Sequence, residues 1–269
     1  MGTKRLPKIE RRNRILDILM EKGTVEVGEL ARMFECCEMS IRNDLKELND
    51  AGKLQRKHGG AEIARPANLE IPLSEREKSH FHEKELIGKV AATLVYPGDS
   101  IMIDAGTTTE KTAKHLESFT DLTVITNGIN ILSVLMRYPR ISLYTIEGRV
   151  DHRSFSIVGQ DAERTLSKYH ARLSFISIDG LTLDHGLMND SFEATNISRI
   201  LLSNSQRKVL LADSSKIGKV GVSLLGPTDL IDTIITDSGI SAEYLSALRD
   251  RGIEVMIADE ILSTDHRPW

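Results

Sequence analysis

The segment Val27–Ala61 constrains the fold of this chain more than any other feature, because it holds two short helical patterns followed by a basic turn with two glycines. Apolar residues recur with the period of an α-helix over Val27–Phe34 and again over Ile41–Leu48. Short strands are expected at 54–56 and 61–63, on either side of the turn. Helices and hairpin in this order predict a winged helix-turn-helix, a fold that places its second helix in the major groove of DNA.

The polar face of the second helix, here called the recognition helix, carries side chains suited to reading DNA. Arginine pairs with guanine and asparagine with adenine, while serine and lysine reach bases or phosphates. Each helix alone would fit an ordinary solvated surface, but the order of the elements favours the DNA-binding interpretation. The residues expected to contact DNA are Ser40, Arg42, Asn43, Lys46, Arg56, Lys57, His58 and Gly59.

Two flanking features complete this small domain. A helix over 8–20 is expected to add Ile15, Leu16 and Leu19 to its apolar core. Gly52 is well placed to end the recognition helix, because glycine readily adopts the left-handed conformation that follows a helix.

The charge of the chain is distributed unevenly. Residues 1–65 hold 14 Lys and Arg against 11 Asp and Glu, a net charge of +3. The whole chain carries −4, so residues 66–269 carry −7. A basic head on an acidic body suits a DNA-reading domain attached to a second domain with another task.

Neither a membrane span nor a secretory signal is visible in the sequence. The apolar runs are too short to cross a bilayer, and the N-terminus MGTKRLPKIERR lacks an apolar core, so we expect a cytoplasmic protein. Cys36 and Cys37 are the only cysteines; neighbours rarely form a disulfide, and two thiols alone make no zinc site. Inert thiols are favoured over a redox switch, and no metal or cofactor is expected.

The pattern changes after a proline-containing stretch near 65–77. Apolar strand-like runs then alternate with helical patterns, which predicts an α/β fold with a mostly parallel sheet covered on both faces. The expected strands are 100–104, 122–126, 141–146, 173–178, 208–212, 233–236 and 254–258. The expected division of the chain is 1–65 for the winged domain, 66–80 for a linker, 81–260 for the α/β domain and 261–269 for a flexible tail.

Polar turns follow several of these strands, at the sheet edge where parallel α/β folds bind ligands. The segment 104–109, DAGTTT, opens a helix, where backbone N–H groups attract an anion. An ordinary strand-to-helix turn with a threonine cap is the alternative. Further polar residues expected at this edge are Thr126, Asn127, Asp179, Glu193 and Lys216. Five such turns together favour a binding site, although any single residue fits a structural role equally well.

Several of these motifs carry a family resemblance. IRNDL, followed after a glycine by LQRKHGGA, resembles the DeoR/GlpR family of bacterial transcriptional regulators, and DAGTTT, TN and DSSK resemble that family's effector domain. The resemblance implies a sensor similar in fold to ribose-5-phosphate isomerase and the CoA-transferases, which binds a phosphorylated sugar or related metabolite and thereby changes DNA affinity. The residues that it implies for the pocket are Asp104, Gly106, Thr107, Thr108, Thr109, Thr126, Asn127, Asp179, Glu193 and Lys216.

The chain departs from the family pattern at four positions. Cys37 stands where the family usually has a serine that caps the recognition helix, and a thiol is the poorer acceptor. Glu147 and Asp151 replace a neutral and a basic residue near the expected pocket, and Ser177 replaces a glycine. These changes leave open which effector binds and whether it carries a phosphate.

Two functions from different classes follow. The first is a repressor of a sugar or sugar-derivative catabolic operon, a homodimer or homotetramer on symmetric operator half-sites of double-stranded DNA, modulated by a small-molecule effector. The second is a sugar-phosphate isomerase in which Asp104, Glu193 and Lys216 serve as acid, base and electrostatic group. The DNA-reading head argues against the enzyme, so no catalytic residue is assigned. Operator, effector and the choice between repression and activation stay open.

Overall fold

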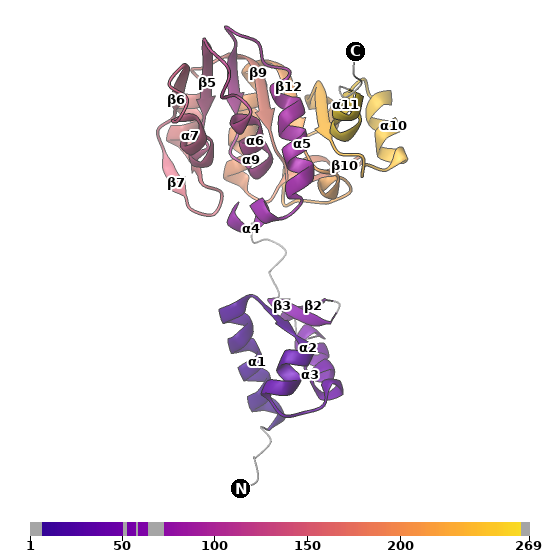
Figure 1. The fold of residues 1–269 in the computed structure, drawn as a ribbon. Helices are drawn as coiled ribbons and strands as arrows, with labels where there is room; N and C mark the ends of the chain where they lie inside the picture. Colours follow the sequence, from indigo (N-terminus) through magenta and orange to yellow (C-terminus); the bar gives the residue numbers. More distant parts are fainter. Residues whose placement is uncertain (1–6, 51–52, 58, 64–72, 265–269) are drawn as a thin grey trace. The chain divides into compact units, whose positions relative to one another are not determined.

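The computed structural model describes residues 7–50, 53–57, 59–63 and 73–264. The chain divides into two compact units, 1–69 and 70–269 (Figure 1). Gly52 and His58, the stretch 64–72 and the end of the chain from 265, including Trp269, lie outside the described residues. None of the described helices has the length and apolar composition that a membrane span requires.

The first unit is the predicted winged helix-turn-helix. Its elements are α1 (Lys8–Lys22), β1 (Thr24–Glu26), α2 (Val27–Met33), α3 (Glu38–Asp50), β2 (Leu54–Lys57) and β3 (Gly60–Ile63). The predicted helices and both strands of the hairpin are confirmed. Strand β1 was not expected; it pairs antiparallel with β3, which makes the wing three-stranded.

Close packing between β1 and β3 requires a glycine at position 60. A Cβ atom there would lie 2.0 Å from the carbonyl oxygen of Val25, far inside van der Waals contact. The strands approach each other over a core to which α1, α2 and α3 contribute Ile15, Leu30 and Ile41, all at most 1% exposed. Gly60, the second glycine of the turn, is therefore required by the packing of the two strands.

A buried carboxylate ties the recognition helix α3 to α1. Asp44 is fully buried, and its two carboxylate oxygens lie 2.6 Å from Arg11 Nε and 3.1 Å from Arg12 Nε. Lys8 and Arg12 also pair with Glu47, one turn further along α3. Breaking a buried ion pair lowers the free energy of unfolding by about 3–5 kcal/mol. This contact therefore fixes the position of α3 relative to α1.

The second unit is built on a seven-stranded sheet in which every neighbouring pair is parallel. The spatial order is β15-β14-β12-β9-β4-β5-β6. The strands are β4 (Ser100–Ile103), β5 (Leu122–Thr126), β6 (Ile141–Thr145), β9 (Ala171–Ile176), β12 (Ser205–Leu211), β14 (Thr233–Thr236) and β15 (Glu254–Ile257). All seven predicted strands are confirmed, with ends that differ by a few residues.

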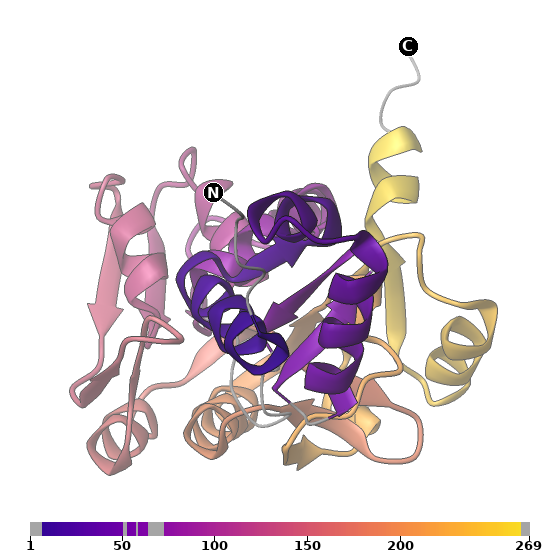
Figure 2. The same cartoon turned by 90° about the horizontal axis from the view of Figure 1, so that it is seen from below.

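Helices cover both faces of this sheet. One face carries α5 (Phe81–Ala92), α6 (Thr107–Lys114), α7 (Ile129–Leu135) and α11 (Ala258–Thr264), and the other carries α8 (Gln160–Leu166), α9 (Phe192–Ser203) and α10 (Ala242–Asp250). On β4, Ile101 and Ile103 join the first core while Met102 joins the second, as alternation along a strand requires. α10 and α11 lie toward the β15 edge in both views (Figure 1, Figure 2).

Two small antiparallel sheets stand beside the large one, and neither was expected. The first is a hairpin of β7 (Arg149–Asp151) and β8 (Ser156–Val158); the second contains β10 (Gly180–Thr182), β11 (Gly186–Asn189) and β13 (Ser223–Gly226). The hairpin docks on the turn after β5, where Ile157 N donates to the Asn127 carbonyl at 2.8 Å. Short 3-10 turns, η1 (Ser214–Lys216) and η2 (Thr228–Leu230), complete the unit.

The structure differs from the expected division of the chain at two places. A helix, α4 (Leu73–Lys78), lies inside the interval 66–80 that the sequence assigned to a linker. α11 continues to Thr264, so the first part of the interval assigned to a flexible tail is helical instead. Both short helices carry apolar side chains that pack on the second unit, such as Leu73, which is 6% exposed.

Candidate functional site

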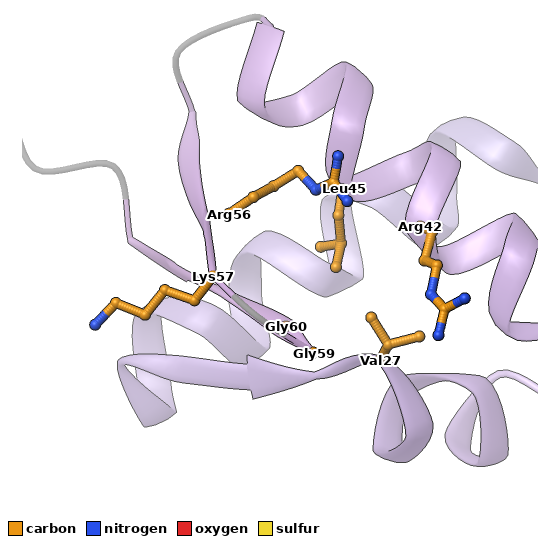
Figure 3. A pocket seen from close by; sticks show the side chains of 7 residues that line it. All are labelled: Val27, Arg42, Leu45, Arg56, Lys57, Gly59 and Gly60. Atoms are coloured by element: carbon orange, nitrogen blue, oxygen red, sulfur yellow. The ribbon is translucent and has the colours of Figure 1, made fainter.

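The polar face of α3 points away from the core of the first unit. Arg42, Asn43 and Lys46 are exposed and Ser40 is half-buried, while the intervening apolar residues are covered. A groove of about 370 Å³ runs between this helix and the wing (Figure 3). It is lined by Val27, Arg42, Leu45, Arg56, Lys57, Gly59 and Gly60. Arg42 of the helix and Arg56 and Lys57 of the wing therefore line one shared groove, whereas Lys46 is exposed outside its lining.

Two of these cations have carboxylate partners within the unit, one exposed and one half-buried. Arg42 Nη2 lies 2.8 Å from Glu38 Oε2 one turn back, and Lys57 Nζ lies 2.5 Å from Glu62 Oε2 across the hairpin. Exposed pairs of this kind contribute at most about 1 kcal/mol. A phosphate or a guanine edge can thus replace either carboxylate at little cost.

Cys37 stands immediately before α3, at the position of a helix cap. Its carbonyl accepts a hydrogen bond from Ser40 N at 2.9 Å, and its Sγ lies 3.2 Å from Ser40 Oγ. The thiol therefore contacts the hydroxyl group of a residue expected at the DNA. Cys37 is exposed and Cys36 is half-buried.

A second site lies in the other unit, at the carboxyl ends of β4, β5 and β9. Polar side chains from α4, both small sheets and α9 join the strand ends around a cavity of about 30 Å³, here called the polar cavity. Its lining residues are Arg76, Asp104, Ala105, Asn127, Ser154, Ser156, Ser177, Ile178, Asp179, Asn189, Ala194 and Ser198. This volume is about that of one water molecule in the liquid.

Asp104 is the buried acid of the polar cavity, only 6% exposed. Ser198 Oγ donates to Oδ2 at 2.8 Å, and Ala105 N donates to Oδ1 at 2.8 Å. Burial outweighs these hydrogen bonds and raises the pKa of Asp104 to about 6. Near neutral pH this carboxylate is held in place and ready to accept hydrogen bonds from hydroxyl groups.

Asp179 forms ion pairs with two cations at the cavity. Arg76 Nη1 and Lys216 Nζ both lie 3.6 Å from its Oδ1, while Asp190 N donates to Oδ2 at 3.0 Å. Burial, with the nearby charge of Asp179, raises the pKa of Asp190. Two cations thus share one oxygen of one carboxylate, at a distance longer than a charge-assisted hydrogen bond.

Asn189 supplies an unused donor to the same cavity. The residue is 3% exposed, and its Nδ2 has no hydrogen-bond partner among the residues that the structure describes. A buried donor without a partner costs about 1–3 kcal/mol. The amide therefore suits a water molecule or an acceptor oxygen of a bound molecule.

The sequence-predicted pocket residues fall into three groups. Asp104, Asn127 and Asp179 line the polar cavity, and Lys216 reaches it through its ion pair with Asp179. Glu193 is half-exposed and lies 2.5 Å from Arg149 Nη2, so it is not among the lining residues. The remaining residues, all nearly covered but not lining the cavity, are Gly106, Thr107, Thr108, Thr109 and Thr126.

The covered residues of the 104–109 turn hold its shape. Thr109 Oγ1 donates to the Gly106 carbonyl at 3.1 Å, and Thr126 Oγ1 donates to the Ile103 carbonyl at 2.6 Å. A Cβ at Gly106 would lie 2.3 Å from Ser177 Oγ, so glycine allows these strand ends to approach. This arrangement agrees with the alternative of a structural strand-to-helix turn beside the cavity.

Sequence reasoning missed six polar lining residues: Arg76, Ser154, Ser156, Ser177, Asn189 and Ser198. The serines of the hairpin come into place only when β8 docks on the turn after β5. Ser198 lies mid-helix in α9, and Arg76 lies in the interval assigned to a linker. Ser154 lies in the turn between β7 and β8, so no alternation along a strand marks it in the sequence.

The two acidic departures from the family pattern act differently. Asp151 Oδ2 accepts from Ser154 Oγ at 2.6 Å, and Ser154 Oγ lies 2.6 Å from Ser156 Oγ. Asp151 therefore orients two lining hydroxyls without lining the cavity. Glu147 accepts from Thr165 Oγ1 at 2.7 Å on the exposed side of the hairpin. Among the described residues, no group of three or more His, Cys, Asp or Glu is arranged to hold a metal ion.

Comparison with known protein families matches both units. Residues 11–67 match the family described as the DeoR-like helix-turn-helix domain, and residues 79–238 match the DeoR C-terminal sensor domain. The regulator GolR of Listeria innocua is 33% identical over 250 residues, which cover 93% of this chain and 98% of that protein. The glycerol-3-phosphate regulon repressor of Escherichia coli is 26% identical over 93% of this chain and 99% of that protein. GlcR, a transcriptional repressor of Bacillus subtilis, is 29% identical over 93% and 96%.

Solved structures show weaker likeness. A ribose 5-phosphate isomerase from Methanocaldococcus jannaschii has a TM-score of 0.39 and 20% identity, over 52% of this chain and 55% of the isomerase. RipA from Yersinia pestis has a TM-score of 0.43 and 14% identity, over 63% of this chain and 47% of RipA. The chain thus spans about half the length of each, and likeness of this degree carries no argument about activity or ligand.

Proposed function

This chain belongs to the DeoR family of helix-turn-helix transcriptional regulators with a C-terminal sensor domain, and on that premise we propose that it represses a catabolic operon for a sugar or sugar derivative. The relatives named as repressors, among them the glycerol-3-phosphate regulon repressor, support this assignment. The observation that carries it is the presence in one chain of an outward basic helix face and a small cavity lined by hydroxyls and charges.

The proposed DNA contacts follow the outward side chains of α3 and the wing. Ser40, Arg42, Asn43 and Lys46 read base edges, while Arg56, Lys57 and Gly59 contact the phosphate backbone. His58, expected beside them, lies outside the described residues. A homodimer or homotetramer would present two such helices to symmetric half-sites of double-stranded operator DNA in the cytoplasm.

The proposed effector is a small polyhydroxylated anion, most simply a phosphorylated sugar. Asp104, Asn127 and Asn189 suit hydroxyl groups, because carboxylate and amide groups of this kind bind sugar hydroxyls. Arg76 and Lys216 suit a phosphate, since both are cations that already approach a carboxylate oxygen of Asp179. The cavity of about 30 Å³ is smaller than a sugar phosphate, so the ligand either widens it or extends from it toward solvent.

We propose no catalytic role for the cavity. An isomerase of the kind considered from the sequence needs Glu193 beside Asp104, whereas Glu193 pairs with Arg149 away from the lining. Effector binding instead favours a conformation with weaker DNA contact, because a ligand shifts an equilibrium only through differential affinity.

A thermal-shift screen tests this proposal. The full chain and its Asp104→Ala variant are heated with phosphorylated sugars, free sugars, amino sugars and hexitols, because a ligand of the folded state raises the melting temperature. We expect a phosphosugar to stabilise the wild type and not the variant. Stabilisation by unphosphorylated compounds alone would remove the phosphate from the proposal, and equal shifts in both proteins would remove the site.

A further inference from the structure

Two charged side chains, Arg76 and Asp179, line the polar cavity, and a third, Lys216, pairs with Asp179 beside it. Arg76 and Lys216 approach the same oxygen of Asp179, each at 3.6 Å, and the three side chains are only 16%, 22% and 15% exposed. The space that they leave is about 30 Å³. A ligand that enters the cavity therefore meets the pair of Arg76 and Asp179 directly.

Arg76 differs from Lys216 in the element that carries it. Lys216 comes from η1, a turn after strand β12 in the middle of the sheet. Arg76 comes from α4, the first described element after the 64–72 stretch, which follows the wing strand β3 along the chain. A movement of Arg76 is thus a movement of the segment directly connected to the DNA-binding unit.

α4 is attached at both ends to groups next to the cavity. At its start, Leu73 N donates to the Arg153 carbonyl at 3.0 Å, one residue before the lining Ser154. At its end, Lys84 Nζ donates to the carbonyl of Arg76 at 2.6 Å and to that of Ser79 at 2.7 Å. Lys84 is 3% exposed, so this amine is buried under the turn that it holds.

The contact between Arg76 and Asp179 is weak enough to be exchanged. Charge-assisted hydrogen bonds have donor–acceptor distances of about 2.7–2.9 Å, whereas this pair stands at 3.6 Å. A guanidinium group binds a phosphate through two parallel hydrogen bonds, a geometry that an amine cannot match. An entering anion is repelled by Asp179 and attracted by Arg76, which favours transfer of Arg76 from the carboxylate to the ligand.

We propose, on the basis of the proposed function, that Arg76 couples the polar cavity to DNA binding: an anionic ligand replaces Asp179 as the partner of Arg76, and the resulting shift of α4 reaches the winged unit through the connecting chain. Arg76 is thereby both a ligand-binding residue and the residue that transmits occupancy. Lys216 binds the same anion but does not transmit the occupancy of the cavity to the DNA-binding unit.

A double-mutant cycle tests this coupling without a known ligand. Asp179→Asn removes the carboxylate charge beside Arg76 and so weakens the contact that a bound anion would displace. The affinity of the full chain for a DNA fragment that the wild type selects from a random pool is measured for this variant in three backgrounds: wild type, Arg76→Gln and Lys216→Gln. Lys216 is the matched control, because it contacts the same Asp179 oxygen at the same distance from another element.

We expect Asp179→Asn to weaken DNA binding at least threefold in the wild-type and Lys216→Gln backgrounds, and to have no effect in the Arg76→Gln background. An equal effect in all three backgrounds, or none in any, would overturn the role of Arg76. Tighter DNA binding that vanishes only with Arg76→Gln would support the coupling and contradict release as the proposed function. If the wild type selects no DNA sequence from the pool, both the proposed repressor function and the coupling through Arg76 are contradicted.

Circular dichroism and the melting temperature establish that each variant is folded. If Arg76→Gln unfolds, Arg76→Met takes its place in the cycle, because methionine keeps an apolar stem and carries no charge. The expected result for Arg76→Met is the same: no effect of Asp179→Asn on DNA affinity.

Discussion

Ser198 donates a hydrogen bond of 2.8 Å to Oδ2 of Asp104, although 94 residues separate them in the sequence. The contact joins the end of β4 to the middle of α9 and places the carboxylate in a buried position, because Asp104 is 6% and Ser198 0% exposed. This pairing explains why Asp104 combines a fixed orientation with a pKa raised to about 6 by burial.

The first prediction concerns Asp104 and pH. Because its pKa is about 6 in the folded chain against an ordinary 3.8, the folded state retains a proton that the unfolded state loses between these values. The stability of the second unit should therefore fall as pH rises from about 4 to about 6, by about 3 kcal/mol in all. In Asp104→Asn the part of this decrease that Asp104 causes should vanish, while the part caused by the raised pKa of Asp190 remains; urea unfolding of both full-length proteins at a series of pH values measures the difference. Parallel pH profiles would contradict the buried, shifted carboxylate.

The second prediction concerns the contact between α1 and α3. Asp44→Ala leaves Arg11 and Arg12 without their buried partner, so the winged unit should lose about 3–5 kcal/mol of stability and the chain should lose DNA affinity. Glu47→Gln is the control: its side chain is 47% exposed, and the loss should stay below about 1 kcal/mol. Urea unfolding and DNA titration of the full chain measure both, and similar losses for the two variants would count against a structural role for Asp44.

The third prediction separates base reading from phosphate contact. Arg42→Ala should cost about 1–3 kcal/mol on the selected DNA and relax sequence preference, if Arg42 pairs with a guanine. Lys57→Ala should weaken binding to all DNA sequences alike and reduce the slope of log affinity against log salt by about 1. Titrations of specific and scrambled DNA at several salt concentrations give both quantities. A uniform, salt-dependent loss for Arg42→Ala would move it from the bases to the backbone.

The fourth prediction concerns the wing. A methyl group at position 60 would meet the Val25 carbonyl at 2.0 Å, so Gly60→Ala should destabilise the first unit by about 1–3 kcal/mol. Gly28→Ala in α2 meets nothing within 4 Å and should be stabilising by about 0.5–1 kcal/mol. Thermal unfolding of the two variants compares them directly, and a neutral Gly60→Ala would show that β1 and β3 can move apart.

The sequence predicted correctly those helices and strands that have a continuous run or face of apolar residues. The period over Val27–Phe34 and Ile41–Leu48 became α2 and α3, and all seven apolar runs became strands of the large sheet. Local periodicity is sufficient there because each element buries its own apolar face in one core. Short elements such as β1, with a single buried residue, leave no such pattern.

The polar cavity was only partly predictable, for a physical reason. Asp104, Asn127 and Asp179 follow predicted strands, and parallel strands bring their carboxyl ends to one edge. Ser154, Asn189 and Arg76 arrive on a hairpin, a small antiparallel sheet and a short helix, whose docking depends on contacts between distant segments. Glu193 was assigned to the pocket because it stands at the start of a helix. Its ion pair with Arg149 of the hairpin depends on two distant segments and could not be predicted from either one alone.

The most direct test of the account is whether occupancy of the polar cavity releases DNA. Fluorescence anisotropy of the selected DNA fragment is measured with the full chain, with and without a saturating concentration of the compound that stabilises it in the thermal-shift screen. We predict that DNA affinity falls about tenfold for the wild type, a typical allosteric coupling, and stays constant for Asp104→Ala. Equal DNA affinity of the wild type with and without the bound compound would contradict the account.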